Sequence, residues 1–362
     1  MPSEPTSFSS ESYFATQPPP STLEHDIAGV RNFVARQQAS GRNVVLVTSG
    51  GTTVPLELNV VRFLDNFSAG TRGATSAEYF LKSGYAVIFM HRQFSLQPFS
   101  RHYSHSTNPF LDFLEIDEDQ PSSSFSSSHP QISSSSLTSQ TSSEPKAATC
   151  PSQIGVTPSK RTHLLEVLTA YKQVHASGTL HTLTFVTVND YLWLLRAVSQ
   201  ELSALNRKAM YYLAAAVSDF FLPRQKMSEH KIQSGKGSLH IEMDQVPKIL
   251  KPMVDEWTRN GYIVSFKLET DPALLIPKAR ASLERYGHQV VIGNDLNRRK
   301  FEVVFVSRKV SSTPVRLTTG SEDVFEENWL RIDLNQDNDK EIEEDIVREL
   351  VKRHEEWVRK EE

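Results

Sequence analysis

The chain has 362 residues, which suits one large α/β domain or two ordinary ones, and its 39 basic and 43 acidic side chains leave a formal net charge of −4. This near balance of charge argues against nucleic acid or an anionic membrane as a partner. The one cysteine, Cys150, excludes an internal disulfide, and no apolar run reaches the length of about 18 residues that spans a bilayer, so a cytoplasmic protein, or one that is also nuclear, is expected.

The first third of the chain alternates between helical and strand patterns. Residues 1–25 are rich in proline and serine and are predicted to form a disordered tail. Residues 27–39 place apolar side chains on one helical face, and residues 43–47 (NVVLV) are typical of a buried strand that ends in a TSGGT loop. The loop FLDNFSAGTRGAT (63–75) then precedes a helix, and YAVIFM (85–90) is the next expected strand. That loop matches neither G-x-x-x-x-G-K-[ST] nor G-x-G-x-x-G.

A serine-rich segment, residues 119–160, interrupts this pattern. Its low complexity gives it too little apolar surface to order itself. Strand and helix patterns of the same kind resume after it. We therefore expect a disordered insertion within a single α/β domain that spans residues 26–362.

The alternation continues to the end of the chain. The elements expected are helix 161–176, strand 180–187, helix 189–205, strand 209–216, a hairpin at 230–243, helix 247–257, strand 261–267, a helix from Asp271 to about Tyr286, strands 288–293 and 301–306, and helix 339–358. This order predicts a Rossmann-like, doubly wound α/β fold, with a mostly parallel sheet, helices on both faces and a small β-hairpin subdomain. Such sheets bind ligands outside the carboxyl ends of their strands.

Five loops that follow predicted strands are rich in glycine, hydroxyl and amide groups. They are residues 48–52, 63–73, 217–220, 266–270 and 294–295. In a doubly wound sheet they converge on one edge, where such groups suit phosphate binding and the polarisation of a carbonyl rather than nucleophilic catalysis. The pattern alone indicates a nucleotide-binding enzyme, with a dinucleotide-dependent oxidoreductase as the competing interpretation. Each signal also has a structural interpretation: the glycines could serve only turns or packing, Asp219 could cap a helix, and Lys231 could be a solvated lysine.

Seven longer blocks narrow this choice. They are VTSGGTTVPLE (47–57), VRFLDNFSAGTRGATSAEYFL (61–81), YYLAAAVSDFFLP (211–223), EHKIQS (229–234), VPKIL (246–250), SFKLETD (265–271) and HQVVIGN (288–294). In this order they resemble the phosphopantothenate–cysteine ligase family of coenzyme A biosynthesis, in its eukaryotic, free-standing form. The resemblance implies ATP- or CTP-dependent amide formation between 4'-phosphopantothenate and L-cysteine. It also implies an acyl-nucleotide intermediate and Mg²⁺ on the phosphates.

The resemblance assigns roles to residues by motif. Asn66 matches the residue that holds the acyl-nucleotide, and Lys231 matches the lysine that supports its formation. The nucleotide-binding positions that it implies are Gly50, Gly51, Ser68, Gly70, Gly73, Ala214, Ala215, Asp219, Phe266 and Asn294. No side chain is assigned as a metal ligand. Gln233 and Ser234 stand where the bacterial, CTP-using branch has two lysines, so ATP is favoured over CTP.

The resemblance also carries an expectation about partners. The family is dimeric, and the hairpin that bears Lys231 reaches toward the partner's site, so a homodimer is expected. Association with other enzymes of the pathway is a further possibility. A non-catalytic scaffold, in which the serine-rich insertion and the charged C-terminal helix recruit partners, remains an alternative, although the intact Asn66 and Lys231 motifs argue against it.

Overall fold

The computed structural model describes residues 8–103, 109–117, 153–309, 324–333 and 340–360. It divides the chain into two compact units. The larger consists of Met1–Arg101 and Ala170–Glu362, and the smaller consists of His102–Thr169. This differs from the single domain expected from the sequence, because the residues around the serine-rich segment form a unit of their own.

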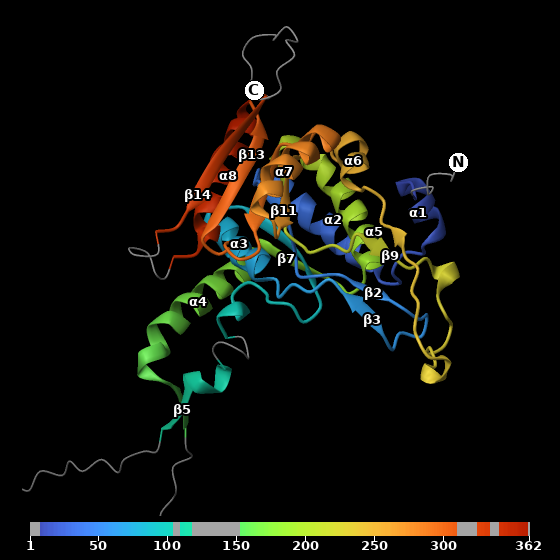
Figure 1. Cartoon of the computed structure of the whole chain (residues 1–362). Coiled ribbons are helices and arrows are strands. Elements are labelled where there is room, and N and C mark those ends of the chain that lie inside the picture. The colour runs from blue at the N-terminus through green and yellow to red at the C-terminus, as the bar shows by residue number, and fades with distance from the viewer. Residues whose placement is uncertain (1–7, 104–108, 118–152, 310–323, 334–339, 361–362) are drawn as a thin grey trace, which may run out of the picture. The chain divides into compact units, whose positions relative to one another are not determined.

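The larger unit is built on one eight-stranded sheet (Figure 1). Its strands, in spatial order, are β14 (Phe325–Arg331), β13 (Glu302–Arg308), β12 (Val290–Asp295), β11 (Tyr262–Glu269), β8 (Ala209–Leu213), β1 (Val44–Ser49), β4 (Ala86–Arg92) and β7 (Leu180–Phe185). The six strands from β12 to β7 are parallel, whereas β13 and β14 add to the sheet in antiparallel fashion. The mostly parallel sheet is therefore confirmed, and β14 is a strand that the sequence did not reveal.

The strand order reverses beside β1. From β1 the chain moves outward through β4 to β7, then returns to β8 on the other side of β1 and continues through β11 to β12. The connections that follow β1 and β8 therefore lead to opposite halves of the sheet. In doubly wound folds this reversal point is where ligands bind.

Helices cover both faces of the sheet. Alternate residues of β1 point to opposite sides: Leu46 joins the cluster of α2 (Leu23–Ala39) and α5 (Val188–Leu202), and Val47 joins that of α3 (Thr71–Lys82) and α8 (Ile342–Arg359). Helix α7 (Pro272–Tyr286) packs on Val291 and Val304, whose neighbours along the strands face α3 and α8. It thus shares a face with α2 and α5. Because both faces are covered, the central parallel strands β1 and β8 are buried along their whole length.

The N-terminal segment corrects one prediction. Within residues 1–25, expected to be disordered, helix α1 (Ser10–Thr16) forms, with the Ser9 hydroxyl capping its first turn. Tyr13 is fully buried, its ring lies 4.9 Å from that of Phe221, and its hydroxyl donates to Asn189 Oδ1 at 3.1 Å. The segment orders because aromatic side chains on α1 pack against the larger unit. The proline- and serine-rich composition of the whole segment does not reveal these few aromatic residues. Residues 1–7 lie outside the described part of the chain.

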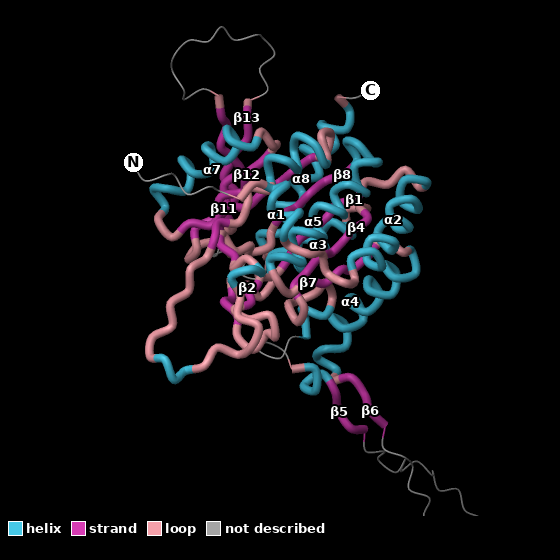
Figure 2. The backbone as a smooth tube through the Cα atoms, turned by 90° about the vertical axis from the view of Figure 1, so that its right-hand side faces the viewer, coloured by secondary structure: helices cyan, strands magenta, loops and turns pink. Residues whose placement is uncertain are grey.

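The end of the serine-rich segment is also ordered. Of the predicted disordered insertion, residues 119–152 lie outside the described residues. Residues 153–160 form strand β6 (Gln153–Val156) and the start of helix α4 (Pro158–Ser177). Strand β6 pairs antiparallel with β5 (Leu114–Asp117), as Figure 2 shows. The insertion therefore ends earlier than predicted, where Pro158 occupies the favoured first position of a helix.

The small antiparallel pairs are not where the hairpin was predicted. They are β5–β6, β2 (Thr53–Pro55) with β3 (Phe63–Asp65), and β9 (Phe220–Phe221) with β10 (Asp244–Gln245). Residues 230–243 contain no strand and only a 3₁₀ turn at Ser234–Lys236. Most of the described side chains in this loop are exposed, so no apolar face holds two strands together there.

The remaining elements are short. They are helix α6 (Leu250–Pro252), a π-helical turn at Met253–Trp257, and 3₁₀ turns at Ser100–Tyr103, Phe110–Phe113, Ser203–Lys208 and Arg224–Lys226. Within the residues that the structure describes, no helix combines the length and apolar character needed to cross a bilayer.

Candidate active site

A pocket of about 700 Å³ opens beside the point where the strand order reverses. It lies at the carboxyl ends of β8, β11 and β12 and at the N-terminus of α3. Eight of the residues singled out in the sequence line it: Asn66, Ser68, Gly70, Ala214, Ala215, Asp219, Phe266 and Asn294. Gly50, Gly51, Gly73 and Lys231 do not line it. The fold thus brings together residues that lie more than 200 positions apart in the chain.

The N-terminus of α3 borders this pocket. Gly70 precedes the helix with a φ of 83°, a left-handed conformation that glycine adopts without strain. Because Gly70 carries no side chain, no side chain caps the first turn of α3. The first N–H groups of the helix are therefore available to an anion, and the helix dipole favours negative charge there.

The glycines outside the pocket have packing roles. A Cβ atom at Gly73 would lie 2.4 Å from Ser49 Oγ, and one at Gly51 would lie 1.9 Å from the carbonyl oxygen of Asn66. Gly73 therefore lets α3 approach β1, and Gly51 lets the Asn66 loop pass close behind it. Gly50 has a φ of 81° in the same turn. At these three positions the glycines therefore serve a turn and close packing, as the structural interpretation predicts.

Phe266 forms an aromatic wall of the pocket. Its ring lies 4.9 Å from that of Tyr212 in an edge-on arrangement, and the guanidinium of Arg72 stands 5.8 Å from its centroid. Arg72 Nη1 is 3.2 Å from Glu343 Oε1, and both side chains line the pocket while being largely buried. Burial raises the pKa of Glu343, and the positive charge of Arg72 opposes that rise. The arginine thus holds a fixed charge at the pocket wall.

Arg72 and Glu343 were not identified from the sequence. Arg72 lies inside the FSAGTRG loop, for which the prediction rests on the glycine, hydroxyl and amide groups alone. Glu343 belongs to α8, beyond the last motif, in a helix with several other acidic residues. Only the packing of α8 against α3 reveals that this one carboxylate reaches the pocket.

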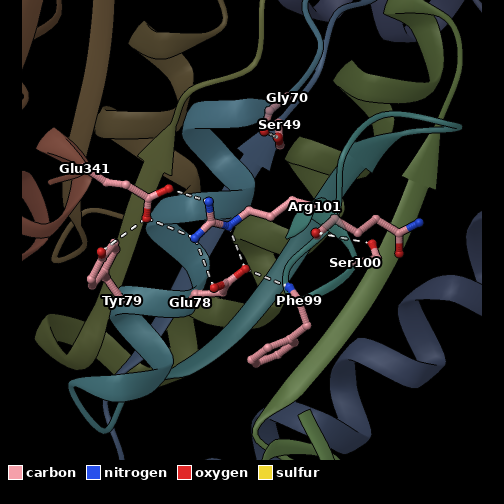
Figure 3. Close-up of polar contacts among 9 residues, drawn as sticks. Ser49, Gly70, Glu78, Tyr79, Phe99, Ser100, Arg101 and Glu341 are labelled. Carbon is pink, nitrogen blue, oxygen red and sulfur yellow. Dashed lines mark hydrogen bonds and ion pairs between the residues drawn. The ribbon is translucent and has the colours of Figure 1, made fainter. Parts of the chain in front are cut away.

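A buried network fixes the start of α8 (Figure 3). Arg101 donates to Glu78 of α3, with Nε 2.7 Å from Oε1, and to Glu341 at the start of α8, with Nη2 3.0 Å from Oε2. The Tyr79 hydroxyl also donates to Glu341, at 3.2 Å. These bonds hold the first turn of α8 against α3, which places Glu343 two residues further on beside Arg72.

Asn294, at the end of β12, is 6% exposed and lines the pocket. Among the described residues, its Oδ1 has no hydrogen-bond partner. An unsatisfied buried amide oxygen costs free energy, and a donor group of a bound ligand would remove that cost. The pocket also carries four further cations: Lys248, Lys267, Arg299 and Lys300. It therefore suits a polyanion that also presents a hydrogen-bond donor.

Lys231 lies apart from this arrangement. It is exposed and sits in the loop after β9, and it does not contribute to the pocket lining of its own chain. A single chain therefore brings Asn66, but not Lys231, to the pocket.

Comparisons with known proteins agree with this architecture. The family model described as the DNA/pantothenate metabolism flavoprotein C-terminal domain matches residues 168–319. The phosphopantothenate–cysteine ligase CAB2 of Saccharomyces cerevisiae is 39% identical over 370 residues, covering 96% of this chain and 86% of the yeast protein. The phosphopantothenate–cysteine ligase of Homo sapiens is 44% identical over 323 residues, covering 89% of each chain. A solved structure of a Cab2 mutant in complex with phosphopantothenate-cysteine has a TM-score of 0.77 at 39% identity, covering 97% of this chain and 99% of that one.

Proposed function

The chain belongs to the phosphopantothenate–cysteine ligase family of coenzyme A biosynthesis, and from this we propose that it uses ATP to activate the carboxylate of 4'-phosphopantothenate before cysteine attacks. A carboxylate is a poor electrophile, so its oxygen first attacks the α-phosphate of the nucleotide and expels pyrophosphate. The cysteine amine then attacks the acyl carbon and releases the nucleotide monophosphate, which leaves an amide. The observation that carries this proposal is the pocket that joins an uncapped helix N-terminus to the held guanidinium of Arg72 and to four further cations.

The charges of the pocket suit this chemistry. The first-turn N–H groups of α3 and the guanidinium of Arg72 are donors on one side, and Lys248, Lys267, Arg299 and Lys300 add positive charge. Both substrates of the activation step carry phosphates, so their mutual repulsion must be offset before they can react. Donors that are already in place stabilise the developing charge without reorganising.

Asn66 is the group proposed to contact the acyl phosphate. Its N–H donates to the carbonyl oxygen of Thr52 at 3.0 Å, so its backbone is fixed while its side chain lines the pocket. An amide side chain donates a hydrogen bond without adding charge. It can thus bind the intermediate without competing with the cysteine amine as a nucleophile.

Mg²⁺ would be held mainly by the substrate's phosphates. Within the described residues, no three or more His, Cys, Asp or Glu side chains are grouped as a metal site. This suits Mg²⁺, which commonly keeps several waters and binds through phosphate oxygens rather than a cage of protein ligands. When bound, it would neutralise phosphate charge and assist the departure of pyrophosphate.

A second copy of the chain is proposed to supply Lys231. Lys231 is outside the pocket of its own chain, and large apolar side chains are exposed on the segment that leads to and follows Asn66. Val60, Val61 and Phe67 have 56%, 57% and 78% of their surface exposed. An exposed apolar patch of this kind is typical of an interface. Pairing of two chains through it would cover the patch and bring the Lys231 loop of one toward the site of the other.

The test is a nucleotide panel with the purified chain and Mg²⁺. We expect pyrophosphate release that requires both 4'-phosphopantothenate and nucleotide, with ATP preferred over CTP, and amide formation only when L-cysteine is added. Release of no pyrophosphate with either nucleotide would rule out the proposed activation step. Faster release with CTP would overturn only the nucleotide preference drawn from Gln233 and Ser234.

A further inference from the structure

Glu57 is a buried carboxylate without a role in the reaction as described so far. It follows β2 and is fully buried. Its Oε2 accepts the backbone N–H of Arg62 at 2.9 Å and that of Val61 at 3.3 Å. Its Oε1 accepts the backbone N–H of Ile232 at 3.2 Å and Nη1 of Arg62 at 2.8 Å. Its hydrogen bonds thus join two loops that lie 170 residues apart in the chain.

The contacts of Glu57 fix the residue that follows Lys231. Ile232 donates its N–H to Glu57, and its carbonyl oxygen accepts from Arg62 Nη1 at 3.0 Å. The backbone N–H and carbonyl groups of Ile232 are therefore both held by one ion pair, of which the carboxylate is buried and the arginine is partly exposed. Within the described residues, the only β pairing near this segment is an isolated bridge between Glu57 and Ser228, so these hydrogen bonds hold the segment where no β-ladder does.

The segment is also fixed just before Lys231. The N–H of Leu58 donates to the carbonyl oxygen of Ser228 at 2.9 Å. The N–H and Nδ2 of Asn59 donate to the carbonyl oxygen of Glu229 at 3.2 and 3.0 Å. Lys231 is therefore one of only two residues between the anchored residues Glu229 and Ile232. All of these anchors come from residues 57–62.

The same pair lies at the base of the Asn66 loop. Glu57 holds the N–H groups of Val61 and Arg62, and β3 (Phe63–Asp65) then leads directly to Asn66. One carboxylate thus fixes the approach to Asn66 and the backbone beside Lys231. A shift of Glu57 would move both.

We propose that Glu57 is a positioning residue for the ligase reaction, because it holds the Lys231 segment and the base of the Asn66 loop in one relative placement. The inference rests on the proposed roles of Lys231 and Asn66. A displacement of about 1 Å at a reacting group can cost about 10²-fold in rate, so a residue that only fixes geometry can still control turnover.

The charge of Glu57 is part of this role. Burial alone would raise its pKa, but the N–H donors of Arg62 and Ile232 and the Arg62 guanidinium outweigh it and lower the pKa to about 2. The group is therefore ionised at neutral pH. A glutamine would remove the charge and turn an NH₂ group toward donors, which breaks at least one of the two connections.

The test is a double-mutant cycle with Glu57→Gln and Lys231→Ala. We measure the pyrophosphate burst with ATP and 4'-phosphopantothenate in the absence of cysteine, together with nucleotide affinity and thermal unfolding. Glu57→Gln should slow the burst by about 10²-fold with little change in nucleotide affinity. In the Lys231→Ala background it should cause a clearly smaller loss, because the part of its effect that acts through Lys231 is already absent and only the displacement of Asn66 remains.

Glu201→Gln is the matched control. Glu201 also pairs with an arginine, since Arg31 Nη2 lies 2.7 Å from its Oε1, but it joins α2 to α5 and lines no part of the pocket. This variant should leave the burst unchanged. If Glu57→Gln fails to fold, Glu57→Asp, which keeps the charge but shortens the reach, takes its place in the cycle.

The outcomes separate this inference from the proposed function. An inactive Lys231→Ala with a fully active Glu57→Gln overturns only the positioning role. The same follows if Glu57→Gln slows the burst equally in both backgrounds, or lowers only thermal stability. A fully active Lys231→Ala overturns the proposed role of Lys231, and the positioning role with it.

Discussion

The backbone around Asn66 suits the role proposed for its small amide side chain, although the loop is exposed. The Asn66 N–H is fixed by Thr52, and its carbonyl oxygen occupies the space that a side chain at Gly51 would need. Both constraints act on the main chain, so the amide group remains available to a ligand. A side-chain donor is preorganised when its main chain is fixed and its own polar group has no other partner.

Replacement of Asn66 by aspartate should therefore separate binding from chemistry. Asn66→Asp loses the donor and adds repulsion toward a phosphate, so we expect amide formation to fall by about 10²–10³-fold, the loss typical of one donor to a developing oxyanion. Nucleotide affinity, measured by calorimetry, should change much less. Asn328→Asp, on the distant strand β14, is the control for charge alone. Unchanged turnover in the Asn66 variant would remove this residue from the reaction.

At the scale of elements, the contact between α3 and β1 sets the position of the pocket. Ser49, the last residue of β1, donates its Oγ hydrogen bond to the carbonyl oxygen of Gly70 at 3.0 Å (Figure 3). One turn further, Gly73 leaves room for the same serine. The N-terminus of α3 is therefore seated directly on the end of a central strand. Small residues at this contact let the helix start where the strand ends.

Gly73→Ala should consequently destabilise the fold. The new methyl group would meet both Oγ and Cβ of Ser49, and overpacking of this kind typically costs about 1–3 kcal/mol. Urea unfolding measures the loss. The double variant with Ser49→Gly should recover part of it, since that change removes both atoms. If Ser49→Gly brings no recovery, the clash with Ser49 is not the reason that Gly73 is required.

At the scale of the whole molecule, two buried histidines join distant parts of the larger unit. His354 of α8 faces the Tyr85 hydroxyl with Nδ1, at 2.7 Å, and the carbonyl oxygen of Arg207 with Nε2, at 2.8 Å. His288 Nε2 lies 2.8 Å from Ser265 Oγ, just before β12. Burial lowers the pKa of each to about 4. Both are therefore neutral in the folded state at pH 7.

These histidines should make stability fall with acid. In the unfolded chain each has a pKa near 6.5, so between about pH 6.5 and 4 the unfolded state binds more protons than the folded state. Their contribution is fully present above about pH 6.5 and decreases toward pH 4, by at most about 3 kcal/mol for each histidine. Urea unfolding across this range measures the slope. His354→Gln should reduce it and exposed His240→Gln should not; an equal slope in all three proteins would contradict this origin.

The sequence predicted the sheet better than its surroundings. Buried parallel strands are continuous apolar runs, so β1, β8 and β12 were identifiable one by one, and the binding-edge rule then placed Asn66, Phe266 and Asn294 at one pocket. β14 was not predicted because four of its seven residues are exposed and three are charged, so it lacks a continuous apolar run. The prediction of a hairpin at 230–243 was wrong, because it relied on glycines that suit a turn. The segment has no apolar face that would hold two strands together. Glu57 and Glu343 escaped because only tertiary packing distinguishes a buried glutamate from an exposed one.

The charged strand β14 has a further consequence. It forms one edge of the sheet, and an uncovered strand edge can add a strand from another molecule. Here Glu327 pairs with Arg280, and Arg331 pairs with Glu302. Extension of the sheet would bring further backbone against these charges. Charged residues on an edge strand disfavour the addition of a further strand, so we expect β14 to resist edge-to-edge aggregation.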